Sequence, residues 1–149
     1  MPYLLDTSVL TRYANKGDAQ HALVIATIKK LSEKGEKLFI TPQNLIEFRA
    51  VATRPSGVPS NGLGWTAIQA KNETTALKSV FLMLDEVPSI FSAWEVLVDA
   101  TQSLGKQVHD ARLAAVALAY GVPHILTFND RHFVRFSAHG VAPVNPASI

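Results

Sequence analysis

Short apolar runs alternate along this chain with longer stretches in which apolar residues recur at helical spacing. The run Tyr3-Leu4-Leu5 is too short for a helix and is typical of a buried strand. Further strands are predicted over 38–41 and 124–127, with a short last one over 141–144. The predicted helices span about 18–34, 42–53, 66–84, a segment around 91–98, and 110–120. Short strands that alternate with helices predict an α/β fold in which helices cover both faces of a parallel sheet.

Some local signals refine this outline. Asp18 is a plausible N-cap of its helix. The spacing of four apolar residues predicts one buried face on the 66–84 helix; they are Leu77, Val80, Phe81 and Leu84. The segment 54–64 is rich in glycine and proline. It is either a mobile loop beside a functional site or a plain connector, and the sequence favours neither.

The composition is that of a single well-cored globular domain over residues 1–149. Hydrophobic residues make up 48% of the chain and charged residues 17%, which is not the profile of a disordered tail. No apolar run approaches the roughly 20 residues needed to cross a bilayer, and we see no signal-peptide pattern. The absence of cysteine excludes disulfides and favours a cytoplasmic protein without a membrane partner. The formal charge of +2 is little evidence for nucleic-acid binding by itself.

Three of the twelve Asp and Glu residues stand among apolar neighbours, where charged groups are normally absent. Asp6 ends the first strand, Glu47 interrupts an apolar run of its helix, and Asp110 begins an alanine-rich stretch. A buried carboxylate is costly unless it is paired, and neighbouring acids raise one another's pKa. A hard divalent cation such as Mg²⁺ removes that cost because it takes oxygen ligands. We therefore predict an oxygen-only metal site that serves phosphodiester chemistry.

Each acid also has a simpler interpretation. Asp6 could cap the turn that follows it, Asp110 could be the N-cap of its helix, and Glu47 could pair with Arg49 or Arg54. All three simpler interpretations would have to be correct at the same time for the site to be absent. The carboxyl ends of the strands are where sites gather in open α/β sheets, so the metal-site hypothesis is geometrically reasonable.

Short polar side chains stand near the same predicted sheet edge. Thr7 and Thr127 are expected to orient the carboxylates or a metal-bound water, although either could equally serve only its local backbone. Asn129 also follows a strand and offers another oxygen. Lys106, in contrast, belongs with Asp99 to a polar stripe that is predicted to face solvent.

Other chemistries find no pattern in this sequence. The five histidines lack the spacing of a zinc motif on one helix face. The eight glycines form neither a G-x-G-x-x-G fingerprint nor a Walker loop, and the serines lack a G-x-S-x-G elbow. Nucleotide cofactors and serine hydrolase chemistry are therefore not expected.

Four segments, in order along the chain, resemble the motifs of the PIN domain family. Residues 6–8 after a short strand are similar to the family's opening motif, and 42–48 to its second acidic helix. Residues 109–115 resemble its third acidic motif and 126–129 its closing strand. The resemblance covers nearly the whole chain. The length, and Arg54-Pro55 at the end of the Glu47 helix, also resemble VapC toxins of toxin–antitoxin pairs.

The resemblance implies a three-layer α/β/α sandwich with a central parallel sheet, and an endoribonuclease that depends on Mg²⁺, with Mn²⁺ as a possible substitute. Asp6, Glu47 and Asp110 would carry the catalysis and, together with Asn129, hold the metal. The implied partners are an RNA substrate, a cognate antitoxin and a second copy of the chain in a homodimer. The nearest basic residues, which could hold the RNA backbone, are Arg12, Arg49, Arg54 and Arg112.

The fourth ligand position departs from the family pattern. Many members have an acid where this chain has Asn129, which keeps an oxygen but loses a charge, and Asp130 follows it. We expect Asn129 at the site and Asp130 as a cap of the helix that follows. The rival functions are a non-catalytic PIN-like module that binds RNA or protein, and an α/β phosphatase or receiver-like domain. The last would want more acids or a lysine around the first strand.

Overall fold

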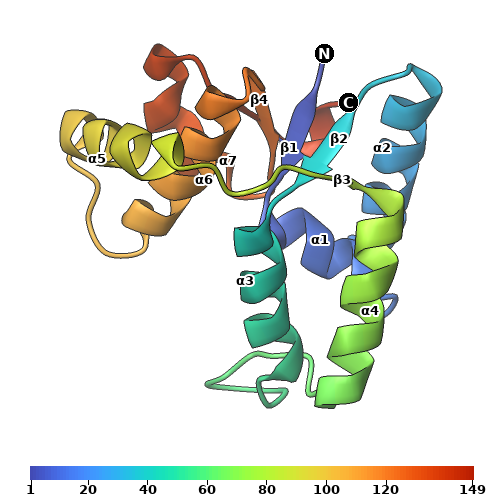
Figure 1. Ribbon diagram of the computed structural model, residues 1–149. Coiled ribbons are helices and arrows are strands. Elements are labelled where there is room, and N and C mark those ends of the chain that lie inside the picture. Colours follow the sequence, from blue (N-terminus) through green and yellow to red (C-terminus); the bar gives the residue numbers. More distant parts are fainter.

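Five parallel strands form the sheet at the centre of the molecule in the computed structural model, which describes residues 1–149 (Figure 1). The strands are β1 (Tyr3–Leu5), β2 (Leu38–Ile40), β3 (Leu82–Met83), β4 (His124–Leu126) and β5 (Ala142–Val144). Their order is β3-β2-β1-β4-β5, and every neighbouring pair is parallel. The predicted parallel sheet is confirmed, including its short last strand.

Seven α-helices flank this sheet. They are α1 (Thr7–Ala14), α2 (His21–Glu33), α3 (Pro42–Thr53), α4 (Ala67–Val80), α5 (Ser89–Thr101), α6 (Gln107–Ala119) and α7 (Asp130–Phe133). Two 3₁₀ helices follow, η1 (Val134–His139) and η2 (Pro146–Ser148). In Figure 1, α5, α6 and α7 lie on one side of the sheet and α1 to α4 on the other. The three-layer α/β/α arrangement is therefore confirmed.

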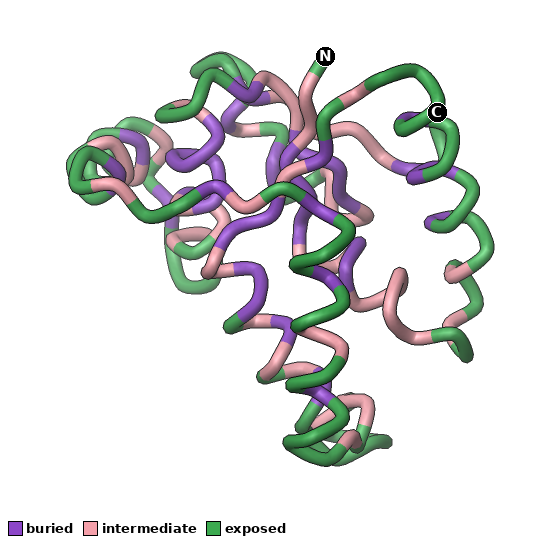
Figure 2. Tube along the Cα trace, turned by 45° about the vertical axis from the view of Figure 1, so that its right-hand side comes forward, coloured by how far each residue is buried: buried purple, intermediate pink, exposed green.

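Alternation along the strands divides the buried residues into two layers. Leu4 and Ile125 are register partners and pack with apolar residues of α5 and α6. Leu5 and Leu126, the next pair, pack with residues of α1 to α4. Successive strand side chains point to opposite faces, so two short strands supply both layers. Burial of each such side chain contributes roughly 1.5–3 kcal/mol. In Figure 2 the buried residues, in purple, gather around the strands and the inner helix faces.

The predicted helix over 66–84 is wrong at its end. Helix α4 stops at Val80, and Phe81 is already extended with φ −109° and ψ 152°. The chain then pairs Leu82 with Phe39 as strand β3. Val80 is 52% exposed and does not belong to the predicted buried face. Local spacing could not reveal this, because the strand is defined by hydrogen bonds to β2, more than 40 residues away.

Other helix boundaries also differ from the sequence prediction. Helix α1 was not predicted, although it carries the buried residues Val9 and Leu10. Helix α2 begins at His21, so Asp18 is not its N-cap, although Asp18 Oδ1 accepts a hydrogen bond from Gln20 N at 2.8 Å. Helix α6 begins at Gln107 and not at Asp110. None of the helices is long and apolar enough to cross a membrane.

The segment 54–64 folds back against the end of α3, as a connector does. Leu63 N donates to Val51 O at 3.1 Å, and Trp65 N donates to Ala52 O at 2.9 Å. At Gly62, a Cβ atom would lie 2.2 Å from the backbone oxygen of Arg54, so only glycine fits this approach. The segment nevertheless brings Arg54, at its start, to the wall of the cavity described below.

Candidate active site

The pairing of β1 with β4 brings the first acid next to a threonine. Leu5 and Leu126 are register partners, so the residues that follow them, Asp6 and Thr127, meet at the carboxyl edge of the sheet. The Thr127 hydroxyl donates to Asp6 Oδ2 at 2.8 Å. Both residues are buried, with 8% and 0% of their surfaces exposed.

Asp6 is held from several directions. Its Oδ1 accepts from Thr7 N at 2.8 Å, which caps helix α1, and its Oδ2 also accepts from the Ser8 hydroxyl at 2.8 Å. The capping interpretation of Asp6 is therefore correct. It does not exclude a role in a site, because Asp6 also lines a cavity at this edge.

Glu47 reaches the same edge from helix α3. This helix starts at a capping box, in which Thr41 and Asn44 bond reciprocally to each other's backbone N–H. Thr7 Oγ1 donates to Glu47 Oε1 at 3.0 Å. No ion pair joins Glu47 to Arg49 or Arg54. The expectation that such a pair explains Glu47 is wrong.

Asp110 lies inside the first turn of α6, whose N-cap position is Lys106. Its interpretation as an N-cap is therefore wrong. Four alanines of α6 are buried in the core that the helix shares with β1 and β4, and their small side chains let the backbone approach closely; they are Ala111, Ala114, Ala115 and Ala117. No hydrogen bond to the Asp110 carboxylate is present in the structure, and the side chain is only partly buried.

The three acids meet in one cavity of about 550 Å³. Asp6, Glu47, Asp110 and Asn129 all line it, as does Thr7. The other lining residues are Ser8, Thr11, Arg12, Ala50, Val51, Arg54 and Lys106. Thr127 lies behind Asp6, which it contacts.

Asn129 and its neighbour Asp130 point to different places. Asn129 lines the cavity, whereas Asp130 Oδ1 accepts a hydrogen bond from Asn145 Nδ2 at 3.2 Å. Asp130 is the first residue of α7, and the N-cap position belongs to Asn129. The expected capping role of Asp130 is therefore wrong, while its place away from the cavity agrees with the sequence prediction.

The acids of the cavity affect one another. Burial raises the pKa of Glu47, and the Asp6 and Asp110 carboxylates raise it further, although the Thr7 hydrogen bond and His109 lower it. Burial also raises the pKa of Asp110; Lys106 lowers it and Asp6 raises it. A raised pKa means that the ionised form is unfavourable where it stands.

The chemistry of this donor set suits a hard divalent cation. All the donors are oxygens, and no lysine or arginine forms an ion pair with any of the three acids. The side chains do not stand in a ready-made cluster, since no group of three His, Cys, Asp or Glu residues is arranged to hold a metal ion. Because Asp6 is fixed by its hydrogen bonds, Glu47 and Asp110 are the residues that would move toward a cation.

Two of the four arginines suggested by the sequence reach the cavity. Arg12 and Arg54 line it, whereas Arg112 bonds to Glu86 and Gln43 and Arg49 to Thr74. Sequence reasoning missed the third cavity cation and assigned it to the solvated stripe. This residue is Lys106, whose spacing of four from Asp110 would have indicated a shared helix face had the start of α6 been recognised.

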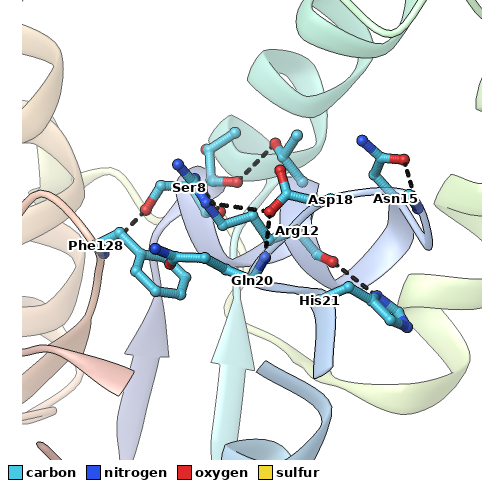
Figure 3. A network of polar contacts seen from close by, with 10 residues as sticks. Ser8, Arg12, Asn15, Asp18, Gln20, His21 and Phe128 are labelled. Carbon is cyan, nitrogen blue, oxygen red and sulfur yellow. Dashed lines mark hydrogen bonds and ion pairs between the residues drawn. The ribbon is translucent and has the colours of Figure 1, made fainter. Parts of the chain in front are cut away.

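Arg12 is held in place by its neighbours (Figure 3). Its Nη1 donates to Ser8 O at 2.9 Å, and its guanidinium carbon lies 4.7 Å from the centre of the Phe128 ring. Asp18 adds an ion pair at 3.9 Å. A cation that is stacked and hydrogen-bonded in this way is already ordered for contact with an anion at the cavity.

The PIN domain family model matches residues 3–138 of this chain. The chain belongs to the PIN domain family. A comparison with curated protein sequences gives no match.

Solved structures with the same fold include several toxin–antitoxin proteins. A chain of VapBC2 from Rickettsia felis, bound to a DNA fragment from their promoter, is 17% identical with a TM-score of 0.73; 97% of this chain and 98% of that chain are covered. A chain of VapBC-1 from nontypeable Haemophilus influenzae is 15% identical with a TM-score of 0.71, covering 99% of each chain. Mycobacterium tuberculosis VapC20, described as a sarcin-ricin loop cleaving toxin, is 22% identical with a TM-score of 0.63, covering 93% and 95%. At these identities the likeness concerns the fold.

Proposed function

We propose that this chain is a metal-dependent endoribonuclease and the toxin of a type II toxin–antitoxin pair. One observation carries the proposal: Asp6, Glu47 and Asp110 come from three separate elements and line one cavity, without an ion pair to any of them. Membership of the PIN domain family supports nuclease chemistry. The toxin–antitoxin role is supported by the fold shared with VapBC proteins and with the sarcin-ricin loop cleaving toxin VapC20.

Asp6, Glu47, Asp110 and Asn129 are the proposed ligands of a divalent cation, with Mg²⁺ as the natural ion and Mn²⁺ as a substitute. When bound, the cation would activate a water molecule and neutralise charge on the phosphodiester. Asp6 is held at the sheet edge by its hydrogen bonds and would therefore be a ligand with a fixed position. Glu47 would position the attacking water, since only its Oε1 is hydrogen-bonded, which leaves Oε2 for that contact.

The basic residues of the cavity are proposed to bind phosphates of the RNA backbone. Arg12, Arg54 and Lys106 line the cavity around the acids. Such contacts position a nucleic acid without reading its sequence, so RNA selection would depend on the shape of the substrate. Arg49 and Arg112 are not assigned this role because neither lines the cavity. The cognate antitoxin and the homodimer remain predictions, and light scattering of the purified chain tests the second.

Cleavage by the purified chain tests the proposed function. We expect it to cut RNA with Mg²⁺ and to stop with a chelator. Asp6→Asn and Asp110→Asn should each lower the rate about 1,000-fold, because several kcal/mol of charge stabilisation depend on the cation and about 1.4 kcal/mol is tenfold. Asp99→Asn, an exposed acid of α5, is the matched control and should cleave normally. Unchanged rates in both site variants would contradict the proposal.

The second candidate is a non-catalytic PIN-like binding module. It is favoured by the missing charge at Asn129 and by acids that are not arranged as a ready-made metal cluster. Expression in bacteria separates the two. A toxin should arrest growth unless its antitoxin is co-expressed, and Asp110→Asn should be harmless. Normal growth with abundant soluble wild-type protein would favour the module.

A further inference from the structure

Two hydroxyl groups that contact Asp6 each have a backbone N–H group behind them. Ser8 Oγ accepts from Phe128 N at 3.2 Å and donates to Asp6 Oδ2 at 2.8 Å. Thr127 Oγ1 accepts from Asn129 N at 2.9 Å and donates to the same oxygen at 2.8 Å. A backbone N–H can only donate. Each hydroxyl proton is therefore directed at the carboxylate.

The third hydroxyl, that of Thr7, follows the same rule with a side chain as its donor. Asn44 Nδ2 donates to Thr7 Oγ1 at 3.3 Å, and Thr7 Oγ1 donates to Glu47 Oε1 at 3.0 Å. The orientation of the Asn44 amide follows from its other end. Asn44 Oδ1 accepts from Thr41 N at 2.9 Å, and Thr41 N can only donate. The amide nitrogen must then face Thr7.

We propose that Asn44 is a positioning residue of the metal site, which acts through Thr7 to hold the Glu47 carboxylate as an acceptor. Asn44 is fully buried and does not line the cavity, so it touches neither the substrate nor a cation. Its amide donates to the Thr7 oxygen, and this leaves the Thr7 proton for Glu47. The inference rests on the proposed function, because it takes Glu47 as a metal ligand.

The simpler role for Asn44 is structural, since it also closes the capping box of α3 with Thr41. A cap stabilises the helix but has no bearing on cation affinity. The two roles separate because Thr41→Ala breaks the side-chain part of the cap and keeps both Thr41 N and the Asn44–Thr7 bond. Asn44→Ala keeps the bond from the backbone N–H of residue 44 to Thr41 Oγ1, but it removes the acceptor of Thr41 N and the bond to Thr7.

The first experiment compares these two variants in chelator-treated protein by thermal melting and by titration with Mn²⁺ alone. Both should lose stability, and Asn44→Ala should lose more, because it also removes the acceptor of the buried Thr41 N–H and the bond to Thr7. Asn44→Ala should weaken Mn²⁺ binding about tenfold, the effect expected for a partner that orients a metal ligand, while Thr41→Ala should stay within about twofold of the wild type. Equal Mn²⁺ affinity in the two variants would reduce Asn44 to a cap and overturn the proposal.

A second pair of variants at Thr7 keeps the proposal falsifiable if Asn44→Ala does not fold. Thr7→Ser retains the hydroxyl and should bind Mn²⁺ as the wild type does, whereas Thr7→Val should lose about tenfold. Combining Thr7→Val with Asn44→Ala should weaken binding no further, because both act on one contact. Wild-type affinity in Thr7→Val would overturn the inference alone. A wild-type protein that binds no Mn²⁺ would overturn the proposed function, and the inference with it.

Discussion

Two acids of the same cavity, Asp6 and Asp110, are held in opposite ways. Asp6 follows a central strand and accepts hydrogen bonds from Thr7 N, Ser8 Oγ and Thr127 Oγ1. Asp110 lies in the first turn of α6, accepts no hydrogen bond in the structure, and has a pKa raised by burial. The Asp6 carboxylate is stabilised by hydrogen bonds within the fold, whereas burial of the Asp110 carboxylate disfavours its charged form.

Glu47 lies between these extremes, since one hydroxyl holds it and burial raises its pKa. The difference divides the three acids by how the fold holds them. The sheet edge fixes one proposed ligand through polar contacts, and the two helices supply acids that are held by fewer hydrogen bonds. Metal binding would then stabilise chiefly the Glu47 and Asp110 carboxylates, which have fewer hydrogen bonds than Asp6.

Of the effects that test this contrast between the two acids, the largest is expected on the stability of the metal-free protein. Asp6→Asn replaces one acceptor oxygen by an NH₂ group that faces donors, so it should cost about 1–3 kcal/mol. Asp110→Asn loses no hydrogen bond and removes a charge from the acidic cluster, so it should raise stability by up to about 1 kcal/mol. Urea melts in a chelator measure both. If the two variants shift stability in the same direction, the comparison between the acids fails.

The effect of pH sharpens the same contrast. The folded-state pKa values of Asp110 and Glu47 are raised, so the stability linked to their protonated forms is complete below the unfolded-state pKa and is lost as pH rises through the folded-state pKa. Asp110→Asn removes this loss for one group. Its stability advantage over the wild type should be near zero at about pH 3.5 and should widen above about pH 4.

Melts of both proteins from acid to neutral pH, in a chelator, check this pH dependence. The exposed Asp99→Asn variant serves as the control, and its difference from the wild type should stay flat. An advantage of Asp110→Asn that is the same at every pH would mean that the carboxylate is not strained in the folded protein.

The smallest effects are expected at the fourth ligand position. Asn129→Asp adds a charged oxygen at the cavity and should tighten Mn²⁺ binding several-fold, because ligand charge tunes cation affinity. Asp130→Asn keeps an oxygen that can accept from Asn145, so its cost should be within about 0.5 kcal/mol. Mn²⁺ titrations and melts measure both variants. Weakened binding in Asp130→Asn, with no change in Asn129→Asp, would move the fourth ligand by one residue.

Much of the fold and most of the candidate site could be predicted from the sequence. Four of the five strands were predicted, because each is a short run of apolar residues that can be recognised in the sequence, as at Tyr3–Leu5. The acids were found because Asp6, Glu47 and Asp110 interrupt apolar surroundings. Strand β3 was missed, since Leu82 and Met83 continue the spacing of the preceding helix and become a strand only by pairing with β2.

The sequence by itself determined most of the elements and the identity of the acids, since each of these is a local property of the chain. Only the tertiary structure decided which polar groups are used elsewhere. Arg112 is removed from the cavity by Glu86, which lies 26 residues earlier, and Thr7 is directed by Asn44, which lies 37 residues later. A hydrogen bond or ion pair between distant residues depends on register and helix packing, and no spacing rule along the chain encodes it.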